Sequence, residues 1–290
     1  MTPRLAVPVA DGGMGGVLAT ETGLASPAVS QRIRRTRAGD GTVLAWQEAG
    51  TGPALLLVHA TASDARQWAR LVPLLAEHFR VVTMDRRGRR ASGAVGPAHS
   101  LATEYGDIAA VAGAVGAPVH ILGHSSGARF ALHAAPDIAH LASLILYEPP
   151  EPRDLPDHLL ASLDRLEAAG DRAGLLRFFL VDYLGNGEDD LAFLQDRPIW
   201  PIMMDNALTL PAELRAGRRY RFSPADVAGI RVPTLLLIGE ESREELGQIT
   251  ATIAAAVPGA TVATLAGQGH GAMFSAPDLL AAEVLGFIRR

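Results

Sequence analysis

Short, wholly apolar runs bounded by turn residues restrict the fold of this chain more than any other feature. Ala54–Val58 and Thr234–Ile238 are the clearest of these runs. Their length suits strands that are buried on both faces of a parallel sheet and is too short for a membrane span. Segments with helical spacing of apolar residues, such as Gln67–Phe79 and Pro277–Ile288, alternate with them. This alternation predicts an α/β fold with a mostly parallel sheet.

The other predicted strands extend this pattern. They comprise a hairpin, Gln31–Arg37 with Thr42–Glu48, and the runs Arg80–Met84, Val119–Leu122, Leu144–Tyr147 and Thr261–Thr264. Together they predict an eight-stranded sheet. Residues 151–230 interrupt the pattern, because they hold helical stretches but no convincing strand. We therefore expect residues 29–150 and 231–290 to form one core and residues 151–230 to form a helical cap, inserted after the sixth strand.

Composition excludes several classes of protein. The chain has 290 residues, of which 48% are hydrophobic, so a large core can form. The formal charge of −5 gives no electrostatic reason to expect nucleic acid or an anionic membrane as a partner. The basic runs Arg86–Arg90 and Arg215–Arg221 are short, and we interpret both as solvated surface. The absence of cysteine excludes disulfides and thiolate chemistry.

Residues 1–28 are rich in Gly, Ala, Pro and Thr and show no sustained periodicity. They predict a flexible N-terminal extension, with packing over the core as the alternative. No continuous apolar stretch resembles a signal peptide. The default expectation for location is therefore the cytoplasm.

The segment Val119–Gly127 contains Gly-x-Ser-x-Gly between a predicted strand and a predicted helix. In this context the pattern predicts a nucleophile elbow, in which Ser125 projects its hydroxyl from a sharp turn. Gly123 and Gly127 would let the flanking backbones approach closely. Without the strand and helix the pattern would be weak, because Gly and Ser are common in loops.

A serine hydroxyl needs a neighbouring base to act as a nucleophile. His270 lies in the Gly-rich loop after the last predicted strand, which is where this chain order places the base. A carboxylate must orient the imidazole. Glu148 at the end of its strand and Glu241 after the next strand both qualify. We slightly favour Glu148, and Glu240 ranks third.

Two backbone N–H groups are needed to bind a developing oxyanion. We expect them from Ser126 and from Thr61, in the loop that follows Ala54–Val58. The predicted pocket residues are His59, Ala60, His124, Phe178, Phe179, Trp200, Met203 and Met204, although apolar residues at helical spacing are more often cap core. No pair of histidines has metal-ligand spacing with a supporting carboxylate, so we predict no metal site and no cofactor.

These motifs, in this order, resemble the α/β-hydrolase superfamily, and in particular small serine hydrolases of actinobacterial type with a helical cap. The resemblance covers residues 31–290. In that family the acid usually lies about three residues after Gly239, where this chain has Ser242. The place of Glu148 is similar to that of the acid in haloalkane dehalogenases, but a serine nucleophile argues against dehalogenation. Two departures from the family are Ala60, where glycine is usual, and Arg90, near which glycine is usual.

The resemblance implies hydrolysis of an ester, thioester or lactone of a small to medium apolar substrate through an acyl-enzyme on Ser125. One alternative is C–C bond hydrolysis, or acyl transfer and cyclisation in natural-product metabolism. Another is a non-catalytic ligand-binding protein of the same fold, which the Ala60 departure would allow. The expected partner is a small-molecule substrate, and a homodimer is left open.

Overall fold

A computed structural model describes residues 30–116 and 118–290 of the chain. Its eight strands form one sheet in the order β1-β2-β4-β3-β5-β6-β7-β8. Strand β2 pairs antiparallel with both β1 and β4, and the other neighbours are parallel. The predicted eight-stranded, mostly parallel α/β sheet is therefore confirmed.

The strands lie close to their predicted ranges. They are β1 Ser30–Arg37, β2 Val43–Ala49, β3 Ala54–Val58, β4 Arg80–Asp85, β5 Val119–His124, β6 Leu141–Tyr147, β7 Thr234–Gly239 and β8 Thr261–Leu265. Every residue of β3 is buried, as expected of a central strand covered on both faces.

Helices cover both faces of the sheet, each over its own apolar cluster. On one face lie α2 (Leu101–Val115), α3 (Ser126–Ala134), α9 (Pro224–Val227) and α10 (Glu244–Ala256). On the other lie α1 (Val72–Ala76), α11 (Ala272–Ser275) and α12 (Pro277–Ile288), together with the short helix η1 (Ala65–Trp68). The single helix predicted over Gln67–Phe79 is thus split into η1 and α1, with Pro73 in the first turn of α1.

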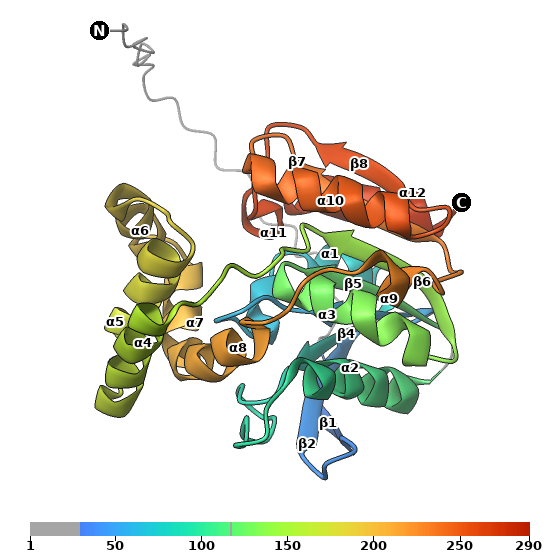
Figure 1. Ribbon diagram of the computed structural model, residues 1–290. Coiled ribbons are helices and arrows are strands. Elements are labelled where there is room, and N and C mark those ends of the chain that lie inside the picture. Colours follow the sequence, from blue (N-terminus) through green and yellow to red (C-terminus); the bar gives the residue numbers. More distant parts are fainter. Residues whose placement is uncertain (1–29, 117) are drawn as a thin grey trace, which may run out of the picture.

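Between β6 and β7 the chain forms a cap of helices beside the core, drawn from yellow to orange in Figure 1. The helices are α4 (Asp157–Ala169), α5 (Arg172–Arg177), η3 (Phe178–Tyr183), α6 (Glu188–Gln195), α7 (Ile199–Asn206), η4 (Ala207–Thr209) and α8 (Leu210–Gly217). They share a third apolar cluster of their own. Val227 and Ile230 pack in the core instead, so the cap ends earlier than residue 230.

The interpretation of Arg86–Arg90 as solvated surface is wrong. Arg86, Arg87 and Arg89 are 0%, 2% and 0% exposed. Each forms an ion pair with a carboxylate from a distant element, namely Glu104, Asp107 and Glu213 in that order. Burial of these guanidinium groups is tolerated because each charge is paired and hydrogen-bonded.

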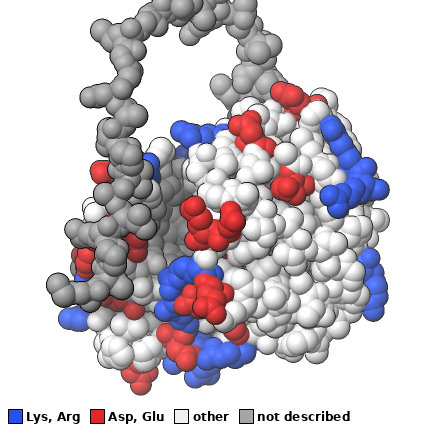
Figure 2. Space-filling view, turned by 90° about the horizontal axis from the view of Figure 1, so that it is seen from above, with Lys and Arg blue, Asp and Glu red and all other residues white. Residues whose placement is uncertain are grey.

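Acidic and basic side chains lie next to one another on the described part of the face shown in Figure 2. Among the described residues, no helix has both the length and the apolar character that crossing a membrane requires. The flexible extension predicted over residues 1–28 lies outside the described residues.

Candidate active site

The turn between β5 and α3 holds Ser125 in a backbone conformation that few residues adopt. Its φ is 54° and its ψ is −126°, and its N–H donates to the Tyr147 carbonyl at 2.9 Å. A Cβ atom on Gly127 would lie 2.4 Å from the Val58 carbonyl oxygen, and one on Gly123 would lie 2.5 Å from the Ala128 Cα. Both positions therefore exclude any side chain, which is the geometry of a nucleophile elbow.

Glu148 and His270, 122 residues apart, meet at the carboxyl edge of the sheet. Glu148 Oε2 lies 2.5 Å from His270 Nδ1. The other carboxylate oxygen accepts hydrogen bonds from the Gly239 N–H at 2.7 Å and from the Ser242 hydroxyl. Burial opposes ionisation of Glu148, but the hydrogen bonds and the nearby imidazole lower its pKa overall. The carboxylate is thus fixed and charged where it can orient the ring.

Ser242 stands where the family usually has its acid. Here its hydroxyl donates a hydrogen bond to Glu148, an acid that follows a different strand, β6. Glu148 itself has a φ of 49°, which a glutamate adopts only when its surroundings fix it. Glu241 lines the nearby cavity, and among the described residues no hydrogen bond joins it to His270. The structure therefore brings Glu148, and not Glu241, to the imidazole.

Two buried side chains fix the loop that carries His270. The Tyr147 hydroxyl donates to the Gly269 carbonyl. His124 Nε2 lies 2.9 Å from the His270 carbonyl oxygen, so this nitrogen carries the proton. His124 Nδ1 then accepts from the Gln67 amide at 3.2 Å. Burial holds the pKa of His124 well below its usual value, so His124 is neutral and acts as a bridge.

The backbone N–H groups of Thr61 and Ser126 have no hydrogen-bond partner among the described residues. Their side chains touch, because the two hydroxyl oxygens are 2.9 Å apart. Ala60 has no left-handed backbone conformation, so its methyl group causes no strain there. Its N–H donates to Gln67 Oε1 at 3.3 Å, so this N–H, unlike that of Thr61, is already engaged.

A carboxylate from the cap, which the sequence analysis missed, completes this loop. Glu213 of α8 accepts from the Thr61 hydroxyl at 3.0 Å and forms ion pairs with Arg86 and Arg89. Arg86 donates to the Ala60 carbonyl at 3.2 Å, so the same charge cluster holds the loop backbone. No local sequence signal marks Glu213, because its partners lie more than a hundred residues away.

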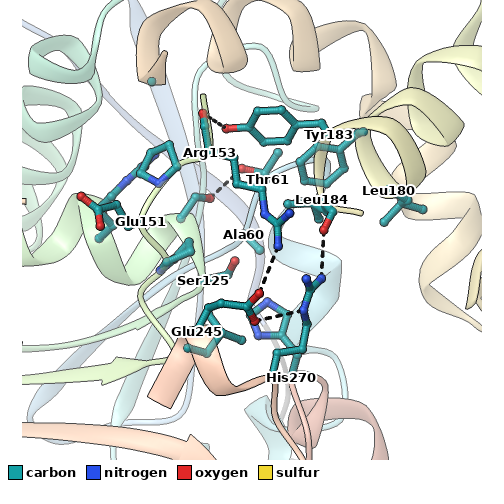
Figure 3. A pocket seen from close by; sticks show the side chains of 18 of the residues that line it. Ala60, Thr61, Ser125, Glu151, Arg153, Leu180, Tyr183, Leu184, Glu245 and His270 are labelled. Carbon is teal, nitrogen blue, oxygen red and sulfur yellow. Dashed lines mark hydrogen bonds and ion pairs between the residues drawn. The ribbon is translucent and has the colours of Figure 1, made fainter. Parts of the chain in front are cut away.

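Ser125 and His270 line one cavity of about 1490 Å³ between cap and core, where Figure 3 shows them near Ala60 and Thr61. The hydrogen bonds of the described residues do not include one between the Ser125 hydroxyl and the His270 ring. Such bonds are often long without substrate. His270 is exposed toward this space, with 46% of its side-chain surface accessible.

Only some of the predicted pocket residues line the cavity. Ala60, His124, Phe179 and Met203 do so, as do the predicted oxyanion residues Thr61 and Ser126. His59, Phe178, Trp200 and Met204 do not, which corrects their assignment. The His59 ring points into the core, where its Nε2 accepts from the Arg86 N–H at 3.1 Å. Phe178, Trp200 and Met204 pack in the apolar cluster of the cap. In the described part of the chain, no group of three or more potential ligands could hold a metal ion.

Comparison with known proteins identifies the family of the chain. The model of the alpha/beta hydrolase family matches residues 55–283. The chain belongs to this family. An alpha/beta hydrolase from Sphaerobacter thermophilus is 32% identical, with a TM-score of 0.78 over 88% of this chain and 99% of that one.

Two curated relatives in this comparison match over shorter stretches. The probable oxidoreductase EphD of Mycobacterium tuberculosis is 38% identical over 107 residues, which is 35% of this chain and 18% of that protein. The N-formylmaleamate deformylase of Pseudomonas putida is 41% identical over 105 residues, 35% of this chain and 39% of that protein. Since the chain spans well under half of both, their activities do not transfer to it directly.

Proposed function

We propose that this hydrolase cleaves an ester, thioester or lactone by a serine mechanism, with Ser125 as nucleophile, His270 as base and Glu148 as the acid that orients the base. The observation that carries the proposal is the Glu148–His270 pair beside a serine on a strained elbow, within one cavity. A surface serine in an ordinary turn would need none of these features.

In this mechanism His270 removes the proton of the Ser125 hydroxyl as its oxygen attacks the substrate carbonyl. The tetrahedral oxyanion accepts hydrogen bonds from the Thr61 and Ser126 N–H groups. His270 then protonates the leaving oxygen or sulfur, and an acyl group remains on Ser125. Water, deprotonated by His270, attacks the acyl-enzyme and releases the acid. Glu148 stabilises the imidazolium in both halves of the reaction.

The decisive test is intact-mass measurement after treatment with a fluorophosphonate, followed by turnover of p-nitrophenyl esters. We expect one adduct on the wild type and none on Ser125→Ala, and much slower labelling of His270→Ala. Turnover should fall by about 10⁴-fold or more in both variants. A folded wild type that is neither labelled nor active would instead favour a non-catalytic ligand-binding protein.

The substrate panel should separate reaction types that share this machinery. It should contain a thioester, a lactone and a diketone for C–C cleavage, as well as an N-formyl amide because of the deformylase relative. We expect the oxygen ester or lactone to give the highest kcat/KM. A diketone turned over faster than every ester would replace ester hydrolysis as the activity.

A further inference from the structure

One buried cation in the cavity wall is not used by the proposed mechanism. Arg129 lies on α3, four residues after Ser125, and is 7% exposed. It lines the same cavity as Ser125 and His270. Its Nε has no hydrogen-bond partner among the described residues. A guanidinium with an unused donor beside a substrate cavity is a natural place to look for a ligand contact.

Arg129 differs from the other buried arginines in its lack of a carboxylate. Arg86, Arg87 and Arg89 each have a carboxylate oxygen within 3.1 Å. No ion pair or hydrogen bond of the described residues involves the Arg129 side chain. An unpaired charge taken out of water is unfavourable, so such groups normally find a partner. A partner of the usual kind would be an anion.

Aromatic rings surround Arg129 in place of acids. Its guanidinium carbon lies 4.9 Å from the ring centre of Phe130 and 5.1 Å from that of Tyr220. These faces give the cation some compensation and fix its orientation, but they accept no strong hydrogen bond. Burial lowers the pKa of Arg129, and the nearby charge of Arg86 adds to this effect. An anion that binds at this site would therefore pair with a guanidinium that folding has already removed from water, so that binding need not desolvate it.

The position on α3 relates this cation to the reacting atoms. Four residues of helix separate Arg129 from Ser125 by about 6 Å along the axis. Helical side chains point back toward the N-terminus, which is the end that holds Ser125. Gly217 of the cap also approaches this group, because a Cβ atom there would lie 4.0 Å from Arg129 Nη2. The guanidinium therefore lies near the cap in the wall of the cavity that Ser125 also lines. From there we expect it to reach a group a few bonds from the scissile carbonyl.

We propose that Arg129 forms an anion subsite, so that the preferred substrate carries a free carboxylate a few bonds from the ester or lactone carbonyl. This inference rests on the proposed function, and it refines the expectation of a purely apolar substrate. The planar guanidinium would bind the carboxylate with charge-assisted hydrogen bonds. The same contact would fix the substrate along the cavity and so place its carbonyl at Ser125.

The test compares two substrates of nearly equal shape, the p-nitrophenyl monoester of glutaric acid and its methyl ester, which is neutral. We expect the wild type to prefer the monoester in kcat/KM by on the order of 10- to 100-fold, the range for hydrogen bonds to a charged group. Arg129→Gln should bring this ratio close to one, and Arg129→Lys should keep part of it. A wild type without preference for the anion overturns the subsite.

A matched control separates the subsite from the general field of the cavity. Arg221 also lines the cavity, but its side chain is 57% exposed and paired with Asp154. Arg221→Gln should therefore leave the substrate ratio near the wild-type value. If Arg221→Gln and Arg129→Gln lower the ratio equally, the preference is a long-range field effect and the proposed contact is wrong.

Binding without turnover keeps this test independent of the proposed reaction. Calorimetry with glutarate and Ser125→Ala should detect binding that weakens at least about tenfold when Arg129→Gln is added. Should the wild type fail to react with fluorophosphonate while glutarate still binds through Arg129, the hydrolase mechanism fails and the subsite stands. Thermal unfolding should show that Ser125→Ala and its double variant with Arg129→Gln are both folded. Equal affinity of the two folded proteins for glutarate eliminates the subsite.

Discussion

The Glu213 carboxylate on cap helix α8 accepts a hydrogen bond from the Thr61 hydroxyl on the core at 3.0 Å. Glu213 is 6% exposed and also forms ion pairs with Arg86 and Arg89. The cap therefore takes part in holding the loop whose Thr61 N–H we propose as an oxyanion donor. In this hydrolase, displacement of the cap would disturb both the cavity and the backbone of the Thr61 loop.

Glu213→Gln should impair both stability and catalysis. Removing the charge leaves Arg89 without its carboxylate, which should lower the free energy of unfolding by about 3 kcal/mol. Loosening the Thr61 loop should reduce kcat by roughly 10- to 100-fold with little change in KM, because the oxyanion contact forms only in the transition state. Urea unfolding and steady-state kinetics measure the two effects.

The control for Glu213 is Glu167→Gln in the same cap. Glu167 pairs with Arg215 at 2.5 Å, but 42% of its side chain is exposed. Its replacement should cost less than about 1 kcal/mol and leave kcat at the wild-type level. Equal losses in the two variants would contradict the special role of Glu213.

Glu148→Gln should lower kcat by about 10⁴-fold, since an amide cannot stabilise the imidazolium and favours the wrong tautomer of His270. Glu241→Gln should retain activity close to the wild type, because no hydrogen bond connects it to the imidazole in the described residues. Turnover of a p-nitrophenyl ester measures both. The opposite ranking of these variants would show that Glu241 is the acid.

The buried His99 should make the protein less stable in mild acid. Burial, partly opposed by Glu104, lowers the pKa of His99 from 6.5 to about 4. In the unfolded chain, His99 takes up a proton as the pH falls through 6.5. In the folded chain, the same imidazole stays neutral until the pH reaches about 4. The free energy of unfolding that His99 contributes above pH 6.5 is therefore lost as the pH falls from 6.5 to about 4. His99→Gln should lose less free energy of unfolding than the wild type between about pH 7 and about pH 5.

Urea titrations at the two pH values check the His99 prediction. His140→Gln, at an exposed loop position, is the control and should follow the wild type. A His99→Gln variant whose stability falls as steeply as that of the wild type would mean that other groups cause the acid sensitivity.

Gly127→Ala should abolish the elbow geometry. The added Cβ would lie 2.4 Å from the Val58 carbonyl and 2.5 Å from the His59 carbonyl, and both are backbone atoms that cannot turn aside. We expect a loss of roughly 1–3 kcal/mol of stability and nearly all turnover. Gly113→Ala on α2 meets no atom within 4 Å and should stabilise the helix by up to about 1 kcal/mol. Thermal unfolding compares the two, and similar behaviour would refute the steric argument.

Local sequence determined the sheet and the elbow. Apolar runs such as Ala54–Val58 fixed the strands because burial on both faces leaves no place for polar side chains. The two glycines around Ser125 were predicted from the local Gly-x-Ser-x-Gly pattern, although the atoms that exclude a side chain at Gly127 belong to the distant strand end at Val58 and His59. Chain order placed His270 in the loop after the last strand. Each of these inferences depended on neighbours in the sequence or on the order of elements.

Tertiary structure decided how the charges are paired. The choice between Glu148 and Glu241 required knowing which carboxylate the Gly239 N–H and the Ser242 hydroxyl would hold. The buried arginines were misread for the same reason. Whether a guanidinium is solvated or buried depends on whether other elements bring a carboxylate to it. The spacing of residues along the chain does not show which distant carboxylates come close.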